Sequence, residues 1–204
     1  KGNYFDNFVS LTFDFDKRNQ KFQTSQGFRN YFKTDIPLIS ETNTLANTFI
    51  TTNYFEFLNN NVLKSSFYFK NSNSLTGDNI KLSERLYLPS NRLRGFESGK
   101  VGPKDGDDFI GGNYISSINF SSDIPKLFEN SQTTDFKMFL DIANVWGVDY
   151  DSGLETSDDI KSALGIGLDW YSPIGPMNFT LSQPLSKGPN DITESFRFNL
   201  GTTF

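Results

Sequence analysis

Hydrophobic and polar residues alternate along most of this chain. In the final segment, "ESFRFNLGTTF" at 194–204, Phe196, Phe198 and Leu200 have one parity and Arg197 has the other. Alternation with a period of two predicts a β-strand with one apolar face and one polar face. Similar alternation occurs in further segments, at 5–16, 27–37, 45–58, 62–70, 112–121, 135–146, 160–170 and 177–183. The pattern therefore predicts about nine strands.

The polar faces of these segments carry small or charged side chains. In 160–170, for example, Ala163 and Gly165 lie opposite Leu164 and Ile166. Small residues fill little volume, so these faces are unlike a packed interior. We expect them to line a water-filled lumen, with the apolar faces turned outward and no hydrophobic core required. The mean hydropathy of −0.46 agrees with that arrangement.

Short turns and long loops alternate between the predicted strands. The segment "SPIGP" at 172–176 predicts a tight turn, because Pro173 and Pro176 fix φ and the glycine between them relieves the bend. The connections at 148–159 and 72–108 are much longer. A meander with short turns at one end and long loops at the other is typical of an outer-membrane barrel. Because a tilted strand of about 9 to 11 residues spans the hydrocarbon, we predict an all-β fold, an antiparallel transmembrane β-barrel meander.

Aromatic residues are abundant, with 22 Phe in the sequence. Trp146, Trp170 and Phe204 fall at the ends of predicted strands, where aromatic rings suit the headgroup interface of a bilayer. Rings are common in the strands of any protein, so none of these residues is decisive alone. Together with the alternation and the loop lengths, they favour a lipid bilayer as the environment of the chain.

Composition excludes several classes of function. A net charge of −5 and a pI near 4.8 argue against a nucleic-acid partner, which needs clustered Lys and Arg. The absence of Cys removes disulfides and thiol nucleophiles, and the absence of His removes the commonest general base. No run of about 18 apolar residues offers a transmembrane helix, so a membrane role must use strands. We therefore expect neither an enzyme nor a cofactor.

Acidic residues cluster in two predicted loops and raise the question of a metal site. They are Asp105, Asp107 and Asp108 in one loop, and Asp149, Asp151, Asp158 and Asp159 in the other. Their spacing matches no known calcium loop. We expect them to be solvated loop charges and expect no metal site.

An ordered set of motifs in the second half of the chain resembles the C-terminal barrel half of the BamA family. These are outer-membrane assembly factors with mitochondrial and plastid relatives. The motifs are "LRGF" at 93–96, "GGN" at 111–113, "FLDIANVW" at 139–146, "GIGLDWYSPIGPMNFTLSQPL" at 165–185 and "FRFNLGTTF" at 196–204. Residues 1–85 have the expected alternation but no distinctive motif.

The resemblance implies that the chain is one part of a larger barrel. The family barrel has sixteen strands, so residues 1–204 would be a single C-terminal portion holding strands 8 to 16, with the first strands and the periplasmic POTRA repeats absent. Nine strands need a partner edge to close into such a barrel. Two rival functions share these patterns: a two-partner secretion translocase, which has the same Arg-Gly-Phe loop, and a passive outer-membrane pore.

In the family, the long loop, here 72–108, folds back into the lumen and its Arg contacts an Asp on the inner wall. Carried over, Arg94 is that Arg and Asp141 is that Asp. Parity agrees, because Asp141 lies opposite its apolar neighbours, and a carboxylate facing lipid would be unfavourable. We expect Gly95 to permit an unusual backbone conformation and Phe96 to fill an apolar notch. Together these four residues form a predicted loop lock.

The last strand supplies a second candidate site. Phe196, Phe198, Leu200 and Phe204 resemble the C-terminal signal of barrel proteins, and Gly201 stands where family members show a kink. Any outer-membrane protein needs such an ending for its own assembly, and that reading is favoured from this segment alone. The resemblance implies more: a loose seam between first and last strands that templates the strands of client barrels.

The implied function is the assembly and insertion of proteins into the bacterial outer membrane, with the mitochondrial outer membrane as the alternative location. The implied partners are the lipid bilayer, unfolded β-barrel clients and accessory lipoproteins of an assembly complex.

Overall fold

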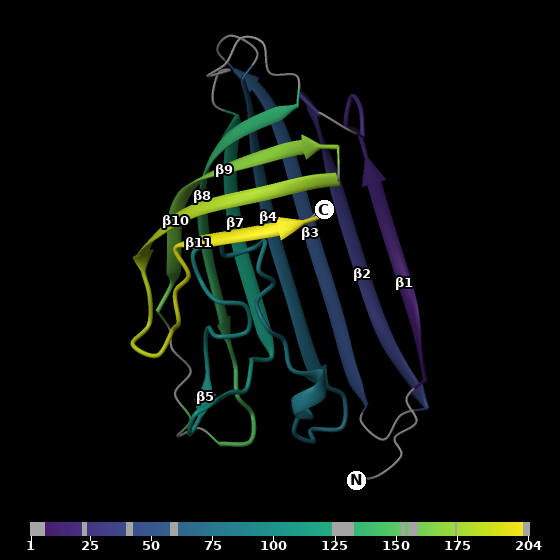
Figure 1. Ribbon diagram of the computed structural model, residues 1–204. Coiled ribbons are helices and arrows are strands. Elements are labelled where there is room, and N and C mark those ends of the chain that lie inside the picture. The colour runs from purple at the N-terminus through teal and green to yellow at the C-terminus, as the bar shows by residue number, and fades with distance from the viewer. Residues whose placement is uncertain are drawn as a thin grey trace.

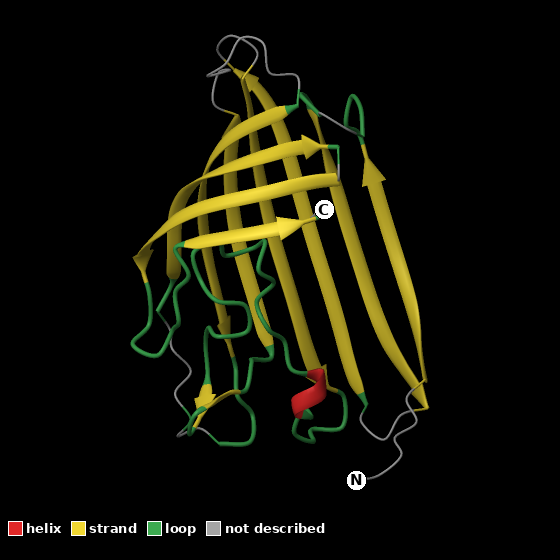
Figure 2. Cartoon of the chain, viewed as in Figure 1, coloured by secondary structure: helices red, strands yellow, loops and turns green. Residues whose placement is uncertain are grey.

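The computed structural model describes residues 7–21, 24–39, 43–57, 61–123, 133–151, 154, 159–173 and 175–201. In these residues, nine strands form one antiparallel sheet in the order β1-β2-β3-β4-β7-β8-β9-β10-β11, which confirms the predicted meander (Figures 1 and 2). The strands are β1 (Asn7–Asp16), β2 (Gly27–Ile39), β3 (Thr44–Phe57), β4 (Asn61–Ser74), β7 (Tyr114–Asp123), β8 (Thr134–Trp146), β9 (Lys161–Ser172), β10 (Gly175–Ser186) and β11 (Phe196–Leu200).

The long connection lies between β4 and β7. It contains a 3-10 turn, η1 (Leu82–Glu84), and a small two-stranded sheet formed by β5 (Lys104–Asp105) and β6 (Asp108–Phe109). Because β4 continues to Ser74, the connection covers residues 75–113 rather than the predicted 72–108. We call residues 75–113 the inner loop.

The last described strand is β11. β11 ends at Leu200, and Gly201 follows with a φ of +109°. That backbone region suits glycine and is rarely adopted by residues with a side chain. The predicted continuation to Phe204 lies outside the described residues.

The sheet is strongly curved, so that β9, β10 and β11 pass in front of β3 and β4 in Figure 1. The inner loop lies on the concave side of this curve, and β1 and β11 stand at the two ends of the strand order. Curvature of this kind follows from the natural twist of antiparallel strands.

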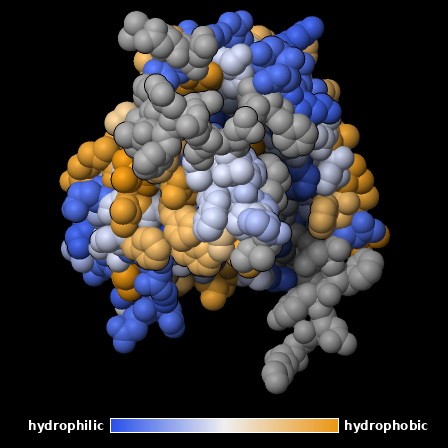
Figure 3. All heavy atoms as spheres, turned by 45° about the horizontal axis from the view of Figure 1, so that its top comes forward, coloured by the Kyte–Doolittle hydropathy of each residue, from blue (hydrophilic) through white to orange (hydrophobic). Residues whose placement is uncertain are grey.

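The convex face of the sheet is apolar. Large hydrophobic side chains are exposed at alternate positions of successive strands, as the sequence pattern predicts. They include Ile118, Phe120, Met138, Leu164, Ile166, Trp170, Leu181 and Phe198. Figure 3 shows apolar residues on both flanks of the molecule. The described residues contain no helix long and apolar enough to cross a membrane.

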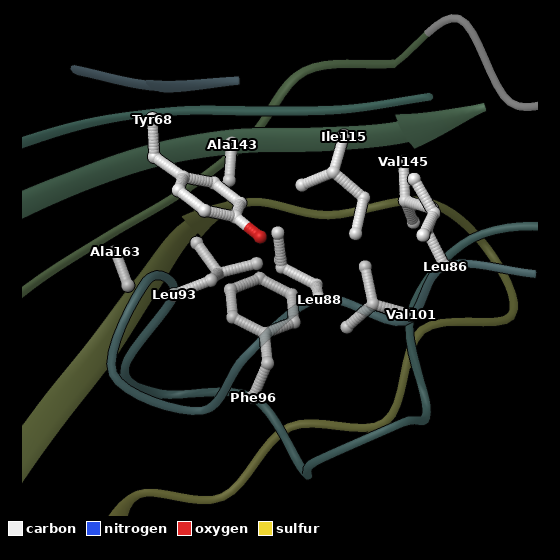
Figure 4. Close-up of a cluster of buried hydrophobic side chains, with 10 residues drawn as sticks. All are labelled: Tyr68, Leu86, Leu88, Leu93, Phe96, Val101, Ile115, Ala143, Val145 and Ala163. Carbon is white, nitrogen blue, oxygen red and sulfur yellow. The ribbon is translucent and has the colours of Figure 1, made fainter. Parts of the chain in front are cut away.

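The concave face corrects one expectation from the sequence. A water-filled lumen without a hydrophobic core was predicted, yet buried apolar side chains form a cluster there (Figure 4). The strands contribute Tyr68, Ile115, Ala143, Val145 and Ala163, and the inner loop contributes Leu86, Leu88, Leu93, Phe96 and Val101. The loop brings its own apolar residues, so part of the inner face is dry.

Candidate functional site: the anchors of the inner loop

Arg94, at the tip of the inner loop, lies against Asp141 on β8. The Arg94 side chain donates from Nε to Oδ2 at 2.7 Å and from Nη2 to Oδ1 at 2.8 Å, and its backbone N–H donates to Oδ2 at 3.0 Å. Asp141 is 0% exposed, and the Arg94 side chain is 23% exposed. Two parallel N–H···O bonds give the bidentate geometry of a strong guanidinium–carboxylate pair. The structure thus brings these two predicted residues together.

Asn119 completes the surroundings of Asp141, and sequence reasoning did not single it out. The two residues are direct partners across β7 and β8. The Asn119 Nδ2 donates to Asp141 Oδ1 and to the Arg92 carbonyl, each at 2.8 Å, while its Oδ1 accepts from Ser117 at 3.0 Å. Asn119 shares its parity with Ser117 on the inner face, and nothing in the local sequence shows that it meets the loop.

An aromatic ring stacks against the Arg94 guanidinium. The Arg94 guanidinium carbon lies 3.6 Å from the centroid of the Phe139 ring, a cation–π geometry. The ring fits there because position 165 is glycine: a Cβ at Gly165 would stand 2.5 Å from the Phe139 ring and 2.3 Å from the Leu181 carbonyl oxygen. In the sequence, Phe139 interrupted the alternation of β8. Its inward position is explained by the stacking on Arg94.

Gly95 and Phe96 lie where the tip of the loop packs against β9 and β10. Gly95 has a φ of +90°, and a Cβ there would stand 3.1 Å from the Ala163 Cβ and 3.2 Å from Ser182. The glycine therefore serves both the backbone conformation and the close approach. Phe96 is 1% exposed and packs in the cluster of Figure 4.

The loop returns to the sheet through the "GGN" motif. Leu86 and Gly112 exchange backbone hydrogen bonds of 2.8 and 2.9 Å, and Asn113 N–H donates to the Gly147 carbonyl. A Cβ at Gly112 would stand 2.4 Å from the carbonyl oxygen of Trp146. Only a residue without a side chain permits this approach, so the motif closes the base of the inner loop.

A second ion pair fixes the beginning of the inner loop. Arg85 pairs with Asp149, which also accepts the Ile80 backbone N–H at 2.8 Å, and the Arg85 guanidinium lies 5.0 Å from the Tyr150 ring centroid. Burial alone would raise the pKa of Asp149, but the Ile80 amide and Arg85 outweigh it and lower this pKa below its ordinary value. Asp149 was expected to be a solvated loop charge. That interpretation was wrong, because its partner is distant in sequence.

Arg197 holds the other side of the inner loop. Sequence reasoning did not identify this residue as part of the site. From β11, its Nη2 donates to the Phe96 carbonyl at 2.6 Å, and its Nη1 donates to the Ser90 carbonyl at 3.1 Å. The same guanidinium pairs with Glu194 at 2.7 Å. The alternation of the last strand showed only that Arg197 faces inward.

The other predicted residues occupy the outer face and the rims. Phe196, Phe198 and Leu200 of β11 are exposed on the outer face, and Phe198 contacts Phe179 of β10 with ring centroids 5.0 Å apart. Gly201 makes the bend after β11, while Phe204 lies outside the described residues.

The two tryptophans lie near opposite rims of the sheet. Trp146 ends β8 and stacks on Tyr114, which begins β7, with ring centroids 5.7 Å apart. Trp170 lies close to the end of β9, beside the turn to β10, and is partly exposed. Both positions suit the interfacial role expected of aromatic residues.

The contacts of this site hold the inner loop in position. In the part of the chain that the structure describes, no group of three or more acidic, His or Cys side chains could hold a metal ion. The anchors consist of ion pairs, glycine contacts and apolar packing, which together fix the loop against β8, β9, β10 and β11.

Comparisons with known proteins give a consistent picture. A family model described as the Omp85 superfamily domain matches residues 1–204, the whole chain. The outer membrane protein assembly factor BamA of Neisseria meningitidis is 30% identical over an alignment of 139 residues, covering 55% of this chain and 17% of that protein. BamA of Neorickettsia risticii is 26% identical over 132 residues, covering 63% of this chain and 18% of that protein.

A SAM50-like protein of Schizosaccharomyces pombe is 28% identical over 140 residues, covering 64% of this chain and 29% of that protein. The chain therefore spans less than a third of each of these three relatives. The crystal structure of BamA from Haemophilus ducreyi lacking POTRA domains 1–3 matches with a TM-score of 0.82 and 23% identity, over 93% of this chain and 41% of that one. At this identity the likeness shows a shared fold.

Proposed function

Because the chain belongs to the Omp85 superfamily, we propose that it is part of the barrel of a protein assembly factor in the bacterial outer membrane. The observation that carries the proposal is the short pairing of β11, the last strand in the sheet order, beside an apolar outer face. Two relatives named as assembly factors support it. The function requires no bond-making chemistry, because strand pairing and burial of apolar surface supply the free energy.

The edge of β11 is suited to receive another strand. β11 pairs with β10 over only five positions, from Met177↔Leu200 to Leu181↔Phe196, although β10 runs from Gly175 to Ser186. Among the described strands, none pairs with the other side of β11. An edge strand presents unpaired N–H and C=O groups, to which a client strand can add. We infer that this edge is one side of the lateral seam.

Gly201 directly follows the paired segment of β11. Its N–H donates to the Pro176 carbonyl at 2.7 Å, and its positive φ bends the chain directly after Leu200. A short paired strand is weaker than a long one, because each ladder hydrogen bond adds to the pairing. The seam would therefore open at this strand before any other.

The inner loop would hold the lumen side of this seam in place. In this proposal Arg94, Gly95, Phe96 and Asp141 act as the lock that keeps the loop inside the barrel. The 204 residues would be one C-terminal portion of that barrel, acting with the bilayer, unfolded β-barrel clients and accessory lipoproteins. The match to 41% of a BamA chain supports a portion of this size.

Cysteine cross-linking to a stalled client tests the seam. Because the 204 residues contain no Cys, Asn199→Cys on β11 introduces the first thiol into this part of the full-length protein. We expect it to form a disulfide with single cysteines along the last strand of a stalled β-barrel client. Leu164→Cys on the outer face of β9 is the matched control and should not cross-link.

Depletion of the protein tests the function as a whole. We expect other outer-membrane barrels to lose their heat-modifiable, folded form while their synthesis continues. Normal folding of those barrels after depletion would reject the assembly function, and equal cross-linking at positions 199 and 164 would reject the seam at β11.

A further inference from the structure

The segment that precedes β11 is joined to the tip of the inner loop by backbone hydrogen bonds. The Glu194 N–H donates to the Gly95 carbonyl at 3.0 Å, and the Glu97 N–H donates to the Ile192 carbonyl at 2.9 Å. The Ile192 N–H in turn donates to the Lys100 carbonyl at 3.1 Å. The two segments thus run side by side, and the loop tip is attached to the chain that enters the edge strand.

Asp191 reinforces this attachment from a buried position. Its Oδ1 accepts the Gly102 N–H at 3.1 Å and its Oδ2 accepts the Gly188 N–H at 2.7 Å. A buried carboxylate that accepts one backbone N–H from each of two segments joins those segments. It therefore fastens residues 188–191 to the loop beyond the "LRGF" motif.

Arg197 extends the attachment into β11 itself. Its guanidinium donates to two carbonyls of the inner loop, those of Ser90 and Phe96, and its side chain is only 15% exposed. Glu194 accepts from the same group at 2.7 and 2.9 Å, which orients it. Moving β11 outward would break these bonds or pull the loop tip with the strand.

We propose that Arg197 is a positioning residue that couples the edge strand β11 to the inner loop, so that the seam opens only when the loop tip is released. The loop tip is held by Asp141 of β8 on one side and by Arg197 of β11 on the other. The coupling thereby links the lock on the inner wall to the seam. Its use in gating rests on the proposed function, whereas the mechanical coupling can be measured without a client.

Hydrogen exchange of the full-length protein in bilayer nanodiscs tests the coupling. Arg197→Gln removes the charge and the paired donors, so we expect amide exchange to rise about tenfold in both β11 and residues 94–97. Exchange in residues 80–86, which Arg85 and Asp149 hold, should not change. Arg29→Gln on β2, which removes an ion pair with Asp14 across β1 and β2, is the control and should leave both segments unchanged.

A more conservative substitution at position 197 provides a second test of the coupling. Arg197→Lys retains the charge but cannot bridge two carbonyls and Glu194 with one fixed fork, so it should raise exchange in the same two segments by a smaller factor. Faster exchange in β11 alone, or no change in either segment, would overturn the coupling. If Arg197→Gln fails to fold, as judged by heat-modifiable mobility, Arg197→Lys provides the same comparison. If exchange rises in both segments but other outer-membrane barrels fold normally after depletion, the proposed function is rejected and the coupling stands.

Discussion

Replacing Arg94 with Ala would leave the carboxylate of Asp141 buried without its guanidinium. Asp141 would keep two donors, the Asn119 side chain and the backbone N–H of position 94. Removing one partner of a buried ion pair costs about 3–5 kcal/mol. We expect the lower end, about 3 kcal/mol of loop docking, because the Arg94 side chain is 23% exposed and water can enter where it leaves. Asp141→Ala should cost less, about 2 kcal/mol, because the freed guanidinium can turn towards water.

The double variant measures whether the two side chains act together. Because both single substitutions remove the same contact, Arg94→Ala with Asp141→Ala should cost little more than the worse single variant. The coupling free energy should then be about 2 kcal/mol. Hydrogen exchange of a peptide covering 93–97 in the full-length protein is the assay, since the amide of position 94 itself donates to Asp141.

Strictly additive effects of the two substitutions would refute the lock, because they would show that the contact contributes nothing to docking. A charge swap between the two positions should not restore the loop, because position 141 is fully buried beside Asn119 and has no room for an Arg side chain.

Three further variants test the surroundings of the lock. Gly165→Leu should displace Phe139, cost about 1–3 kcal/mol through overpacking and speed exchange at the loop tip, whereas unchanged exchange would contradict the support role of that ring. Phe96→Ala should cost about 3–5 kcal/mol in urea unfolding of the full-length protein, as expected for an emptied aromatic site. The lowered pKa of Asp149 makes its contact with Arg85 stable above the ordinary value of 3.8 and weaker as the pH falls through the lower, folded-state pKa. Pepsin cleavage within residues 78–86 should therefore increase at the acid end of that range, and Asp149→Asn should abolish the pH dependence.

The sequence predicts the sheet well because its signal is local. Alternation predicted the strands, and parity predicted that Asp141 points inward. The structure places Asp141 fully buried on the inner face. Each of these statements depends on near neighbours in the chain, which share one strand and therefore one geometry.

The rest of the site depends on contacts between distant segments that have no periodic signal. Arg197 and Ser90 are 107 positions apart, and Arg85 and Asp149 are 64 apart. An Arg or Asp in a polar segment is most often solvated, so residue type did not predict these contacts. The apolar cluster was missed for a related reason, because its loop half comes from a segment whose overall composition is polar.

The separation of the loop contacts along the chain also orders the events by which the protein folds. Strand pairs form between neighbouring segments and close short stretches of chain, whereas the inner loop needs β8 for Asp141 and β11 for Arg197. Contacts between distant residues form late, because more chain entropy must be lost before they are made. The inner loop would therefore remain hydrated through most of folding and dock last, once the final strand is in place. Its docking would be a sign that the sheet is complete.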